Sequence, residues 1–382
     1  MRAASVSIVH PDSRTAGRQA ASELLLALGE APDLVLVFIS SQLDVPAALS
    51  GLWSRLPETT KVAGCSSFAE FDQSEAITGS VTAMGMCGVD AAVFKTDRLG
   101  DASHEAGRHL GEQAKAFGAS LLFAFPDGIT GRHTRFLQGL QSSLGTTFPI
   151  VGGVAAEHLA FVQTYEICQK EALSGGAVVV ALRGRVQVAT AARAGFQAVG
   201  LPRTCTRTQG ESLIVELNGS PASQMYRDFL GDNPPAGAMM GIEFPLMVGV
   251  EDGNKQAGDS VIRVVRQIDE ASSGLLLGGD IAEGNTVRMT RASREGLLQG
   301  TRDAVTEAQQ KLPEPDAVFL FGCAGRKLIL GASYPEEMKI VREQLGESVP
   351  KVGFYTYGEL SPVNGRTLYH DETFTLALVK VD

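Results

Sequence analysis

One sequence unit recurs three times along this chain of 382 residues. Each copy has a strand-like apolar run, a helical connection, a second apolar run that reaches a glycine, and a third apolar run. The first runs of the three copies are residues 33–38, 120–125 and 316–321. Strands that alternate with helices are typical of α/β proteins. The recurrence therefore predicts an α/β fold built from three weakly repeated units of strand, helix, strand, glycine loop and strand.

A carboxylate follows the glycine of each copy at a similar distance. The pairs are Gly64 with Glu70, Gly152 with Glu157, and Gly353 with Glu359, separated by six, five and six residues. A glycine where a strand ends lets the backbone turn sharply or approach a ligand closely. Because open α/β sheets bind ligands where their strands end, we predict that the three glycine loops lie on one side and share a cavity. The alternative is three tight turns, each with a solvated glutamate.

The chain as a whole is predicted to form two domains of mixed β-sheets flanked by helices. Segments with helical periodicity, such as residues 103–117, separate the strand-like runs. Residues 200–258 break this pattern, and within them Asn218-Gly219 is a turn signal while Pro221 suits the first turn of a helix. We therefore predict domains at residues 1–221 and 222–382.

The charge of the chain argues against nucleic acid and anionic lipid as partners. The sequence has 33 Lys and Arg residues against 43 Asp and Glu residues, a formal net charge of −10. A duplex binder needs a dense basic surface, which these scattered basic residues do not form, and the same holds for anionic lipid. The apolar runs have strand length, and the N-terminus lacks the apolar region of a signal peptide. We expect a cytoplasmic protein without a membrane span.

The cysteines and histidines give little support to metal chemistry or to nucleophilic catalysis. The five cysteines include no CxxC pair, and the six histidines form no HxH or HExxH pattern. Cys65 and Cys323 each follow a glycine at a predicted strand end, where a strained turn could expose a thiolate. The alternative is a small buried side chain at each position. Glycine pairs occur without the spacing of a nucleotide-binding loop.

Polar residues inside the predicted glycine loops suit the recognition of a small polar molecule. An arginine can bind a carboxylate and acidic residues can bind an amine. Arg326 is the preferred anchor, paired with a ligand carboxylate or with a loop glutamate, and a surface ion pair is the alternative. We predict as ligand-binding residues Cys65, Ser66, Glu70, Gly152, Gly153, Glu157, Arg326, Tyr357 and Glu359.

These segments, in this order, resemble the FIST family, whose name stands for F-box and intracellular signal transduction. In the N-terminal half the resemblance rests on Gly64-Cys65-Ser66-Ser67 with Glu70, on residues 127–131 and on Gly152-Gly153. In the C-terminal half it rests on residues 216–219, 322–326 and 353–359. The resemblance implies a non-enzymatic cytoplasmic sensor that binds a small ligand. It also implies a separately encoded partner, such as a histidine kinase or a cyclic-di-GMP pathway protein.

Free-standing chains of this length resemble the nitric-oxide-sensing branch of the family, which implies non-covalently bound haem b. His158, beside Glu157, is the first candidate for the axial iron ligand, with Tyr165 and Cys168 as alternatives. An aromatic content of 6% argues mildly against a haem pocket. Two other functions remain open: a sensor of an amino acid or similar small polar ligand without haem, and an enzyme that uses Cys65 or the loop carboxylates.

Overall fold

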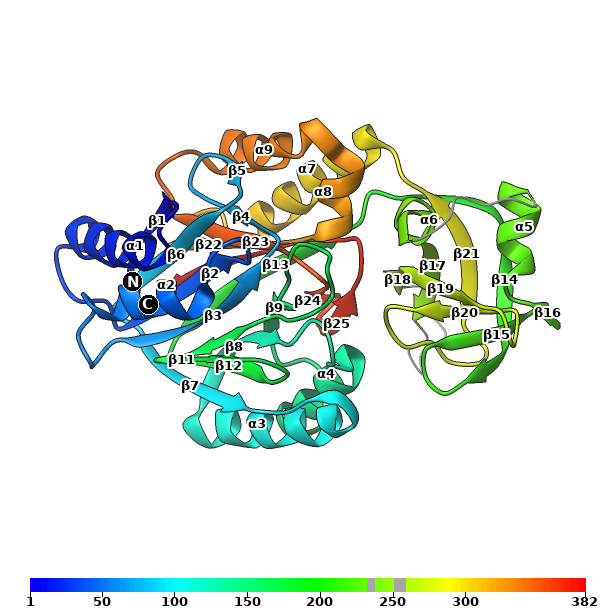
Figure 1. Cartoon of the computed structure of the whole chain (residues 1–382), viewed down its shortest axis with the longest axis horizontal. Helices are drawn as coiled ribbons and strands as arrows, with labels where there is room; N and C mark the ends of the chain where they lie inside the picture. Colours follow the sequence, from blue (N-terminus) through cyan, green and yellow to red (C-terminus); the bar gives the residue numbers. More distant parts are fainter. Residues whose placement is uncertain (232–237, 251–258) are drawn as a thin grey trace.

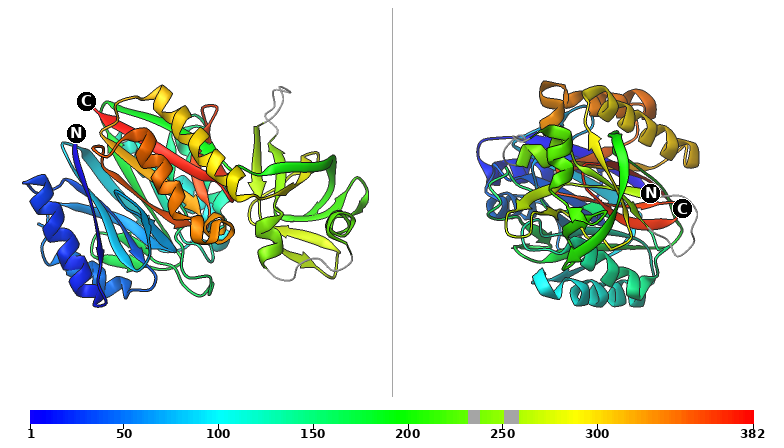
Figure 2. Two further views of the ribbon diagram at one scale, coloured as in Figure 1. Left: turned by 90° about the horizontal axis from the view of Figure 1, so that it is seen from above. Right: turned by 90° about the vertical axis from the view of Figure 1, so that its right-hand side faces the viewer.

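The computed structural model describes residues 1–231, 238–250 and 259–382. The chain forms a large body and a smaller lobe, and the lobe is inserted between β13 (Val186–Arg193) and α7 (Arg294–Lys311) (Figure 1). Both termini lie on the body, where the amino group of Met1 donates to the carbonyl oxygen of Val381 at 3.0 Å. In the left view of Figure 2 the lobe stands at one end of the body, and in the right view it lies in front of the body.

Three six-stranded sheets form the body, and all three have the same order of strands. The first contains β1 (Arg2–Val9), β6 (Ser80–Cys87), β2 (Leu34–Ser40), β3 (Lys61–Ser67), β10 (Glu166–Cys168) and β11 (Glu171–Leu173). The second contains β7 (Asp90–Thr96), β12 (Ala177–Arg183), β8 (Ala119–Pro126), β9 (Ile150–Gly153), β24 (Glu359–Val363) and β25 (Arg366–His370). The third contains β13, β26 (Phe374–Val381), β22 (Ala317–Cys323), β23 (Lys351–Thr356), β4 (Ala69–Phe71) and β5 (Ala76–Ile77).

This common order confirms the threefold recurrence and the α/β class. In each sheet the two central strands pair in parallel, as β2 with β3, β8 with β9, and β22 with β23. Each repeat also gives a hairpin to a neighbouring sheet: β4 and β5 join the third, β10 and β11 the first, and β24 and β25 the second. Because of this cyclic exchange, none of the three sheets comes from one continuous segment.

Helices cover the outer face of each sheet. They are α1 (Ser13–Leu28) and α2 (Val45–Trp53) on the first sheet, α3 (Ser103–Phe117) and α4 (His133–Leu144) on the second, and α7, α8 (Ala324–Leu330) and α9 (Pro335–Leu345) on the third. Short 3₁₀ turns lie at Gly100–Ala102 and Gly331–Ser333. Side-chain caps set several helix starts; Asp12, for example, accepts a hydrogen bond from the backbone nitrogen of Thr15.

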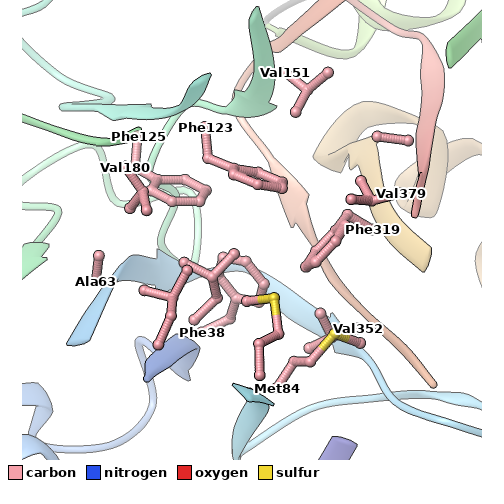
Figure 3. Close-up of a cluster of buried hydrophobic side chains, with 14 of the residues drawn as sticks. Phe38, Ala63, Met84, Phe123, Phe125, Val151, Val180, Phe319, Val352 and Val379 are labelled. Atoms are coloured by element: carbon pink, nitrogen blue, oxygen red, sulfur yellow. The ribbon is translucent and has the colours of Figure 1, made fainter. Parts of the chain in front are cut away.

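The inner faces of the three sheets pack on a common core (Figure 3). The ring of Phe38 on β2 lies 5.6 Å from that of Phe125 on β8 and 6.5 Å from that of Phe321 on β22. The opposite faces of these strands lie under the helices. Burial on both faces explains why the central strands read as nearly continuous apolar runs.

The lobe has a sheet of its own, and its apolar core also includes Leu368 of β25 in the body. Its strands are β14 (Gln197–Gln209), β15 (Leu213–Leu217), β16 (Ser220–Pro221), β17 (Leu246–Val250), β18 (Asp259–Arg263), β19 (Val265–Asp269), β20 (Gly274–Leu277) and β21 (Thr286–Arg291), and its helices are α5 (Gln224–Leu230) and α6 (Ala238–Glu243). No helix in the described part of the chain is long and apolar enough to cross a membrane.

The body and the lobe do not follow the predicted division at residue 221. Pro221 lies in β16, inside the lobe, and the third sheet of the body pairs β4 with β23 and β13 with β26 across that position. Turn signals are local, whereas hairpin exchange and insertion depend on long-range pairing. The division at 221 therefore remains a prediction about sequence domains and does not describe the two parts of the structure.

Candidate functional site

The three glycines of the predicted loops lie inside strands. A Cβ on Gly64, Gly152 or Gly353 would lie 1.7, 2.1 or 1.9 Å from the carbonyl oxygens of Val37, Ala124 and Leu320, respectively. Each glycine therefore lets its strand approach the parallel neighbour closely, which corrects the prediction of ligand loops. Gly153, next to Gly152, is buried as well, and none of these glycines lines the cavity described below.

The ends of these strands nevertheless meet at one end of the body. The backbone nitrogen of Ala156 donates to the carbonyl oxygen of Ser66 at 3.0 Å, and that of Phe68 donates to the carbonyl oxygen of Tyr355 at 3.2 Å. The end of β3 and the residue after it are thus joined by backbone hydrogen bonds to the segment after β9 and to the end of β23.

The strand registers identify which carboxylates are equivalent in the three repeats. Glu70 pairs with Phe354, Glu166 with Cys65, and Glu359 with Gly153, each partner being the residue after a repeat glycine. The glutamate of the second repeat that is equivalent to Glu70 and Glu359 is therefore Glu166. The prediction that Glu157 holds this position is wrong. In the second repeat a longer loop separates β9, which ends at Gly153, from β10, which begins at Glu166, so the equivalent glutamate lies farther along the chain than the spacing suggests.

The three repeat glutamates are fully buried, and each accepts a hydrogen bond from a backbone amide at the equivalent position of its repeat. They accept hydrogen bonds from the backbone nitrogens of Ser80, Gly176 and Thr373 at 3.2, 3.1 and 3.2 Å. Burial raises the pKa of Glu70 to about 7, that of Glu166 to about 9, and that of Glu359 well above its usual range. This shared arrangement is part of the architecture of each sheet.

Cys65 and Ser66 are buried between the sheets. Burial, and then the nearby Glu166, raise the pKa of the Cys65 thiol well above its usual range, which disfavours the nucleophilic thiolate. The Ser66 hydroxyl donates to the carbonyl oxygen of Ala156 at 2.9 Å and accepts from the backbone nitrogen of Tyr165 at 3.0 Å. The Ser66 hydroxyl thus joins β3 to the segment between β9 and β10, and the buried Cys65 thiol gives no support to an enzyme that uses Cys65.

Arg326 is fully buried in α8 and makes an ion pair with Glu337 of α9. Its Nη2 and Nε donate to Glu337 Oε1 at 2.6 and 3.1 Å, and its other donors reach the carbonyl oxygens of Ala194 and Leu297. The prediction that Arg326 faces a ligand cavity, or pairs with Glu70, Glu157 or Glu359, is therefore wrong. Helix α8 directs the side chain toward the neighbouring helices, and the repeat glutamates are held by backbone amides instead.

A cavity of about 370 Å³ lies between the body and the lobe. Its apolar wall comes from both parts and includes Ile129, Leu159, Phe161, Ile242, Val265 and Leu328. Its polar residues are Cys323, Tyr357, Asp371 and Glu372 of the body and Arg266 of the lobe. A mostly apolar hollow of this size with a few convergent polar groups is typical of small-molecule sites.

Tyr357 is the predicted site residue that lines this cavity. Its hydroxyl donates to Glu157 Oε1 at 2.7 Å and accepts from the backbone nitrogen of Leu159 at 3.0 Å. The ring of Phe161 stacks on that of Tyr357 at 5.2 Å, and Glu157 accepts from the backbone nitrogens of Ala160 and Phe161. Glu157 therefore orders the loop that forms one wall and lies behind the cavity surface.

Two buried acids that sequence reasoning missed face the same cavity. Glu372 is 1% exposed; its Oε1 lies 3.7 Å from Cys323 Sγ, and its Oε2 has no hydrogen-bond partner among the described residues. Burial, and then Asp371, raise the pKa of Glu372 to about 8. Asp371 accepts a hydrogen bond from the Tyr369 hydroxyl at 3.0 Å.

Left-handed backbone conformations also gather in this wall. Among the described residues, seven that are not glycine have positive φ, and three of them line the cavity: Leu159 at 62°, Phe161 at 53° and Glu372 at 52°. Such conformations cost on the order of 1–3 kcal/mol each and cluster at functional sites. The strain and the unpaired carboxyl oxygen point to the same place.

Comparison with known sequences identifies the family. The family model of the FIST N domain matches residues 33–220, and that of the FIST C domain matches residues 222–362. The chain belongs to the FIST family. FIST domains are associated with the sensing of small ligands in signal transduction.

Relatives of this FIST protein span distant prokaryotes. The uncharacterized protein Mb0898c of Mycobacterium bovis is 26% identical over 382 residues, which cover 96% of each chain. The uncharacterized protein MJ1623 of Methanocaldococcus jannaschii is 22% identical over 62% of this chain and 49% of its own. Among solved structures, T. maritima PurL complexed with ADP aligns with a TM-score of 0.23 and 11% identity, covering 99% of this chain and 71% of that one.

His158, the predicted haem ligand, lies on the surface of the FIST body outside the cavity. Its Nδ1 is hydrogen-bonded to Ser41 Oγ, and its ring lies 5.5 Å from that of Phe68. The alternative ligand Cys168 is buried in β10. No group of three or more His, Cys, Asp or Glu residues that could hold a metal ion occurs within residues 1–231, 238–250 and 259–382.

The chemistry of the cavity does not fit haem. Haem carries two propionates, whereas the buried polar groups here include the acids Asp371 and Glu372. The hydroxyl of Tyr357 is held by Glu157, and burial together with Glu372 and Glu359 raises the pKa of the Cys323 thiol, which disfavours an iron-binding thiolate. A haem site at His158 would therefore be separate from this cavity.

Proposed function

We propose that this FIST protein is a sensor whose small ligand binds in the cavity between the body and the lobe. The observation that carries the proposal is Oε2 of Glu372, which has no partner within residues 1–231, 238–250 and 259–382 and is buried in a wall that is otherwise mostly apolar. An unsatisfied buried polar group costs about 1–3 kcal/mol. A ligand that donates to this oxygen while it covers the apolar wall would remove that cost.

The two walls suggest how occupancy is transmitted. Leu159, Phe161 and Glu372 belong to the body, whereas Ile242 and Arg266 belong to the lobe. A ligand that contacts both parts favours the arrangement in which both walls are in place, and so shifts the population of body and lobe arrangements. The partner that reads this shift is proposed to be a separate protein, a histidine kinase or a cyclic-di-GMP pathway protein. The chain is proposed to act in the cytoplasm and not as an enzyme.

The ligand class that the cavity favours is an amino acid or a similar small polar molecule with an apolar body. Glu372 offers an acceptor in the interior, and the exposed Arg266 offers a cation at the lobe side. Phe161 and Leu328 provide apolar surface near these groups. The cavity therefore supports the haem-free alternative better than a haem pocket.

The test is thermal and chemical unfolding in the presence of each of the twenty L-amino acids. A ligand at about one hundred times its dissociation constant stabilises the folded state by about 2.7 kcal/mol. We expect at least one amino acid to do so, and expect Leu328→Trp, which fills the cavity, to abolish the effect. Leu26→Trp on exposed α1 is the matched control. If no amino acid stabilises the wild type, this ligand class is contradicted.

Haem at His158 is the second candidate that we propose. The hydrogen bond between Ser41 Oγ and Nδ1 orients the imidazole, and the exposed Val162 on the same loop offers apolar surface to one face of a macrocycle. Haem bound there would supply an iron that coordinates nitric oxide. The test is hemin titration of the wild type, His158→Ala and the exposed control His104→Ala. A Soret band that only His158→Ala lacks supports the site, and no specific uptake by the wild type contradicts it.

A further inference from the structure

We propose that Glu372 determines ligand specificity at this cavity by selecting a ligand with a protonated amine, and that Glu372 releases its own proton when that ligand binds. The inference rests on the proposed function, because it assumes that the cavity is the ligand site. It adds the charge of the ligand, the residue that recognises it, and the fate of one proton.

The three repeats set Glu372 apart from its equivalents. The amides of Ser80, Gly176 and Thr373 donate to the three repeat glutamates, so the residues that precede them are equivalent. These are Gly79 with φ 73°, Gly175 with φ 83°, and Glu372 with φ 52°. The third repeat thus keeps the left-handed backbone but carries a glutamate where the other two have glycine, although glycine avoids the strain.

The space for this glutamate comes from a reciprocal change on the facing segment. Val37 and Leu320 pair with the repeat glycines Gly64 and Gly353, so Gln42 and Gly325, each five residues farther on, are equivalent. In the first repeat Gln42 Oε1 lies 3.1 Å from a Cβ placed on Gly79. In the third, a Cβ on Gly325 would lie 1.9 Å from Glu372 Oε1. In the first repeat the space is filled by Gln42 and faces Gly79. In the third repeat it is filled by Glu372 and faces Gly325.

The surroundings of Glu372 favour its neutral form until a cation arrives. Its titratable and charged neighbours are Asp371, Cys323, Glu359, Tyr357 and Arg326 in the body and Arg263 and Arg266 in the lobe. Arg326 is held by Glu337, and Arg263 reaches Asp371 and not Glu372. With a pKa raised to about 8 by burial and by Asp371, the carboxyl group carries a proton at neutral pH.

An ammonium group next to Oε2 reverses this balance. The carboxylic acid gives its proton to the buffer and becomes a carboxylate, which pairs with the ammonium through charge-assisted hydrogen bonds. Burial strengthens such a pair because water screens it less. A neutral hydroxyl of the same size gains no ion pair, and a carboxylate would place a further acidic group beside the buried acids Asp371 and Glu372. Specificity for the amine follows from the charge.

The test is isothermal titration calorimetry with four probes that share one apolar body: phenethylamine, L-phenylalanine, 2-phenylethanol and 3-phenylpropionate. Titrations at neutral pH in phosphate and in Tris, whose ionisation enthalpies differ, count the protons released. We expect the two amines to bind with release of close to one proton. We expect Glu372→Gln to abolish the release and weaken amine binding at least about tenfold. The exposed Glu347→Gln is the matched control.

The outcomes separate the inference from the proposed function. Binding of the alcohol or the propionate in preference to the amines would keep the cavity as a ligand site and overturn the role of Glu372. Amine binding without proton release would also overturn it. If none of the probes and none of the twenty amino acids binds, the proposed function and this inference both fail. If Glu372→Gln does not fold, the proton count of the wild type decides alone.

Discussion

Arg263 of the lobe lies with its Nη1 3.9 Å from Oδ2 of Asp371 in the body, and both side chains are buried. The same nitrogen donates to the carbonyl oxygen of Tyr369 at 3.1 Å, and the backbone nitrogen of Val264 donates to Asp371 at 3.4 Å. Asp371 is adjacent to Glu372. A polar contact between the two parts of the molecule is therefore next to the cavity, where a change of charge at Glu372 would reach it.

Arg263→Met is expected to loosen the contact between lobe and body. It leaves the carbonyl oxygen of Tyr369 and the carboxyl of Asp371 without this partner, which costs about 1–3 kcal/mol. Urea unfolding measures the loss, and limited proteolysis of the connecting segments measures the loosening. Arg266→Met, at an exposed position, should change stability by less than about 0.5 kcal/mol. Equal effects of the two changes would mean that Arg263 does not hold the lobe.

Gly325→Ala is expected to displace the carboxyl group of Glu372 and to abolish ligand stabilisation. The new Cβ would occupy the place of Oε1, and moving the flexible end of the glutamate out of a packed site costs about 1–3 kcal/mol. The second change Glu372→Gly should restore stability to Gly325→Ala, because it removes the clashing group. Unfolding of the two single variants and the double variant gives the coupling energy. Additive effects would show that the two positions are independent.

Glu372→Gly alone is expected to stabilise the ligand-free protein by about 1–2 kcal/mol, since glycine adopts the left-handed conformation without strain and the unpaired carboxyl disappears. The same change should abolish ligand binding, as a strained functional residue is exchanged for the glycine of the other repeats. Urea unfolding without ligand is the measurement. A clear destabilisation would show that Glu372 supports the fold.

Stability is expected to fall as pH rises from about 6.5 to about 8. Burial raises the pKa of Glu70 to about 7 and that of Glu372 to about 8, so the folded chain holds protons that the unfolded chain has released. The stabilisation from these two carboxyl groups is complete at a pH below their pKa in the unfolded chain. It is lost as the pH rises through their pKa in the folded chain. His133 and His370, whose pKa burial lowers to about 4, act oppositely and only below about pH 6.5. Urea unfolding across this range should give a shallower slope for Glu372→Gln.

The threefold recurrence is predictable from the sequence because each copy keeps its central apolar strand and a glycine that one backbone contact requires. Val37 and Gly64 show this relation, and Leu320 and Gly353 repeat it. The hairpin exchange is not predictable in this way, since the partner of a short strand such as β10 depends on long-range pairing. The second repeat also has a longer loop between β9 and β10, which is why Glu157 takes the place of Glu166 in an alignment based on spacing.

The candidate site is predictable only in part for a related reason. The sequence draws attention to Tyr357, and to Glu157 at the start of the loop that lines the cavity, because both residues follow repeat glycines. Glu372 precedes the last strand of its repeat, outside the aligned glycine segments, and its partner Gly325 lies in residues 322–326, where the sequence draws attention to Arg326 instead. Aligning Gly79 and Gly175 with Glu372 is the signal that could have found it. Arg266 belongs to the lobe, which has no counterpart in the other repeats.

Arg326→Met is expected to destabilise the body by about 3–5 kcal/mol and to leave the ligand selectivity of the cavity unchanged. The change leaves the fully buried Glu337 without its cation, and it also leaves the carbonyl oxygens of Ala194 and Leu297 without a donor. Replacing Glu337 as well, in Arg326→Met with Glu337→Leu, should recover part of the loss, because a buried pair exchanged for apolar side chains leaves no uncompensated charge. Urea unfolding of both variants measures the stability, and titration with phenethylamine and 2-phenylethanol measures the selectivity. A variant that keeps its stability but loses its preference for the amine would return Arg326 to the ligand site.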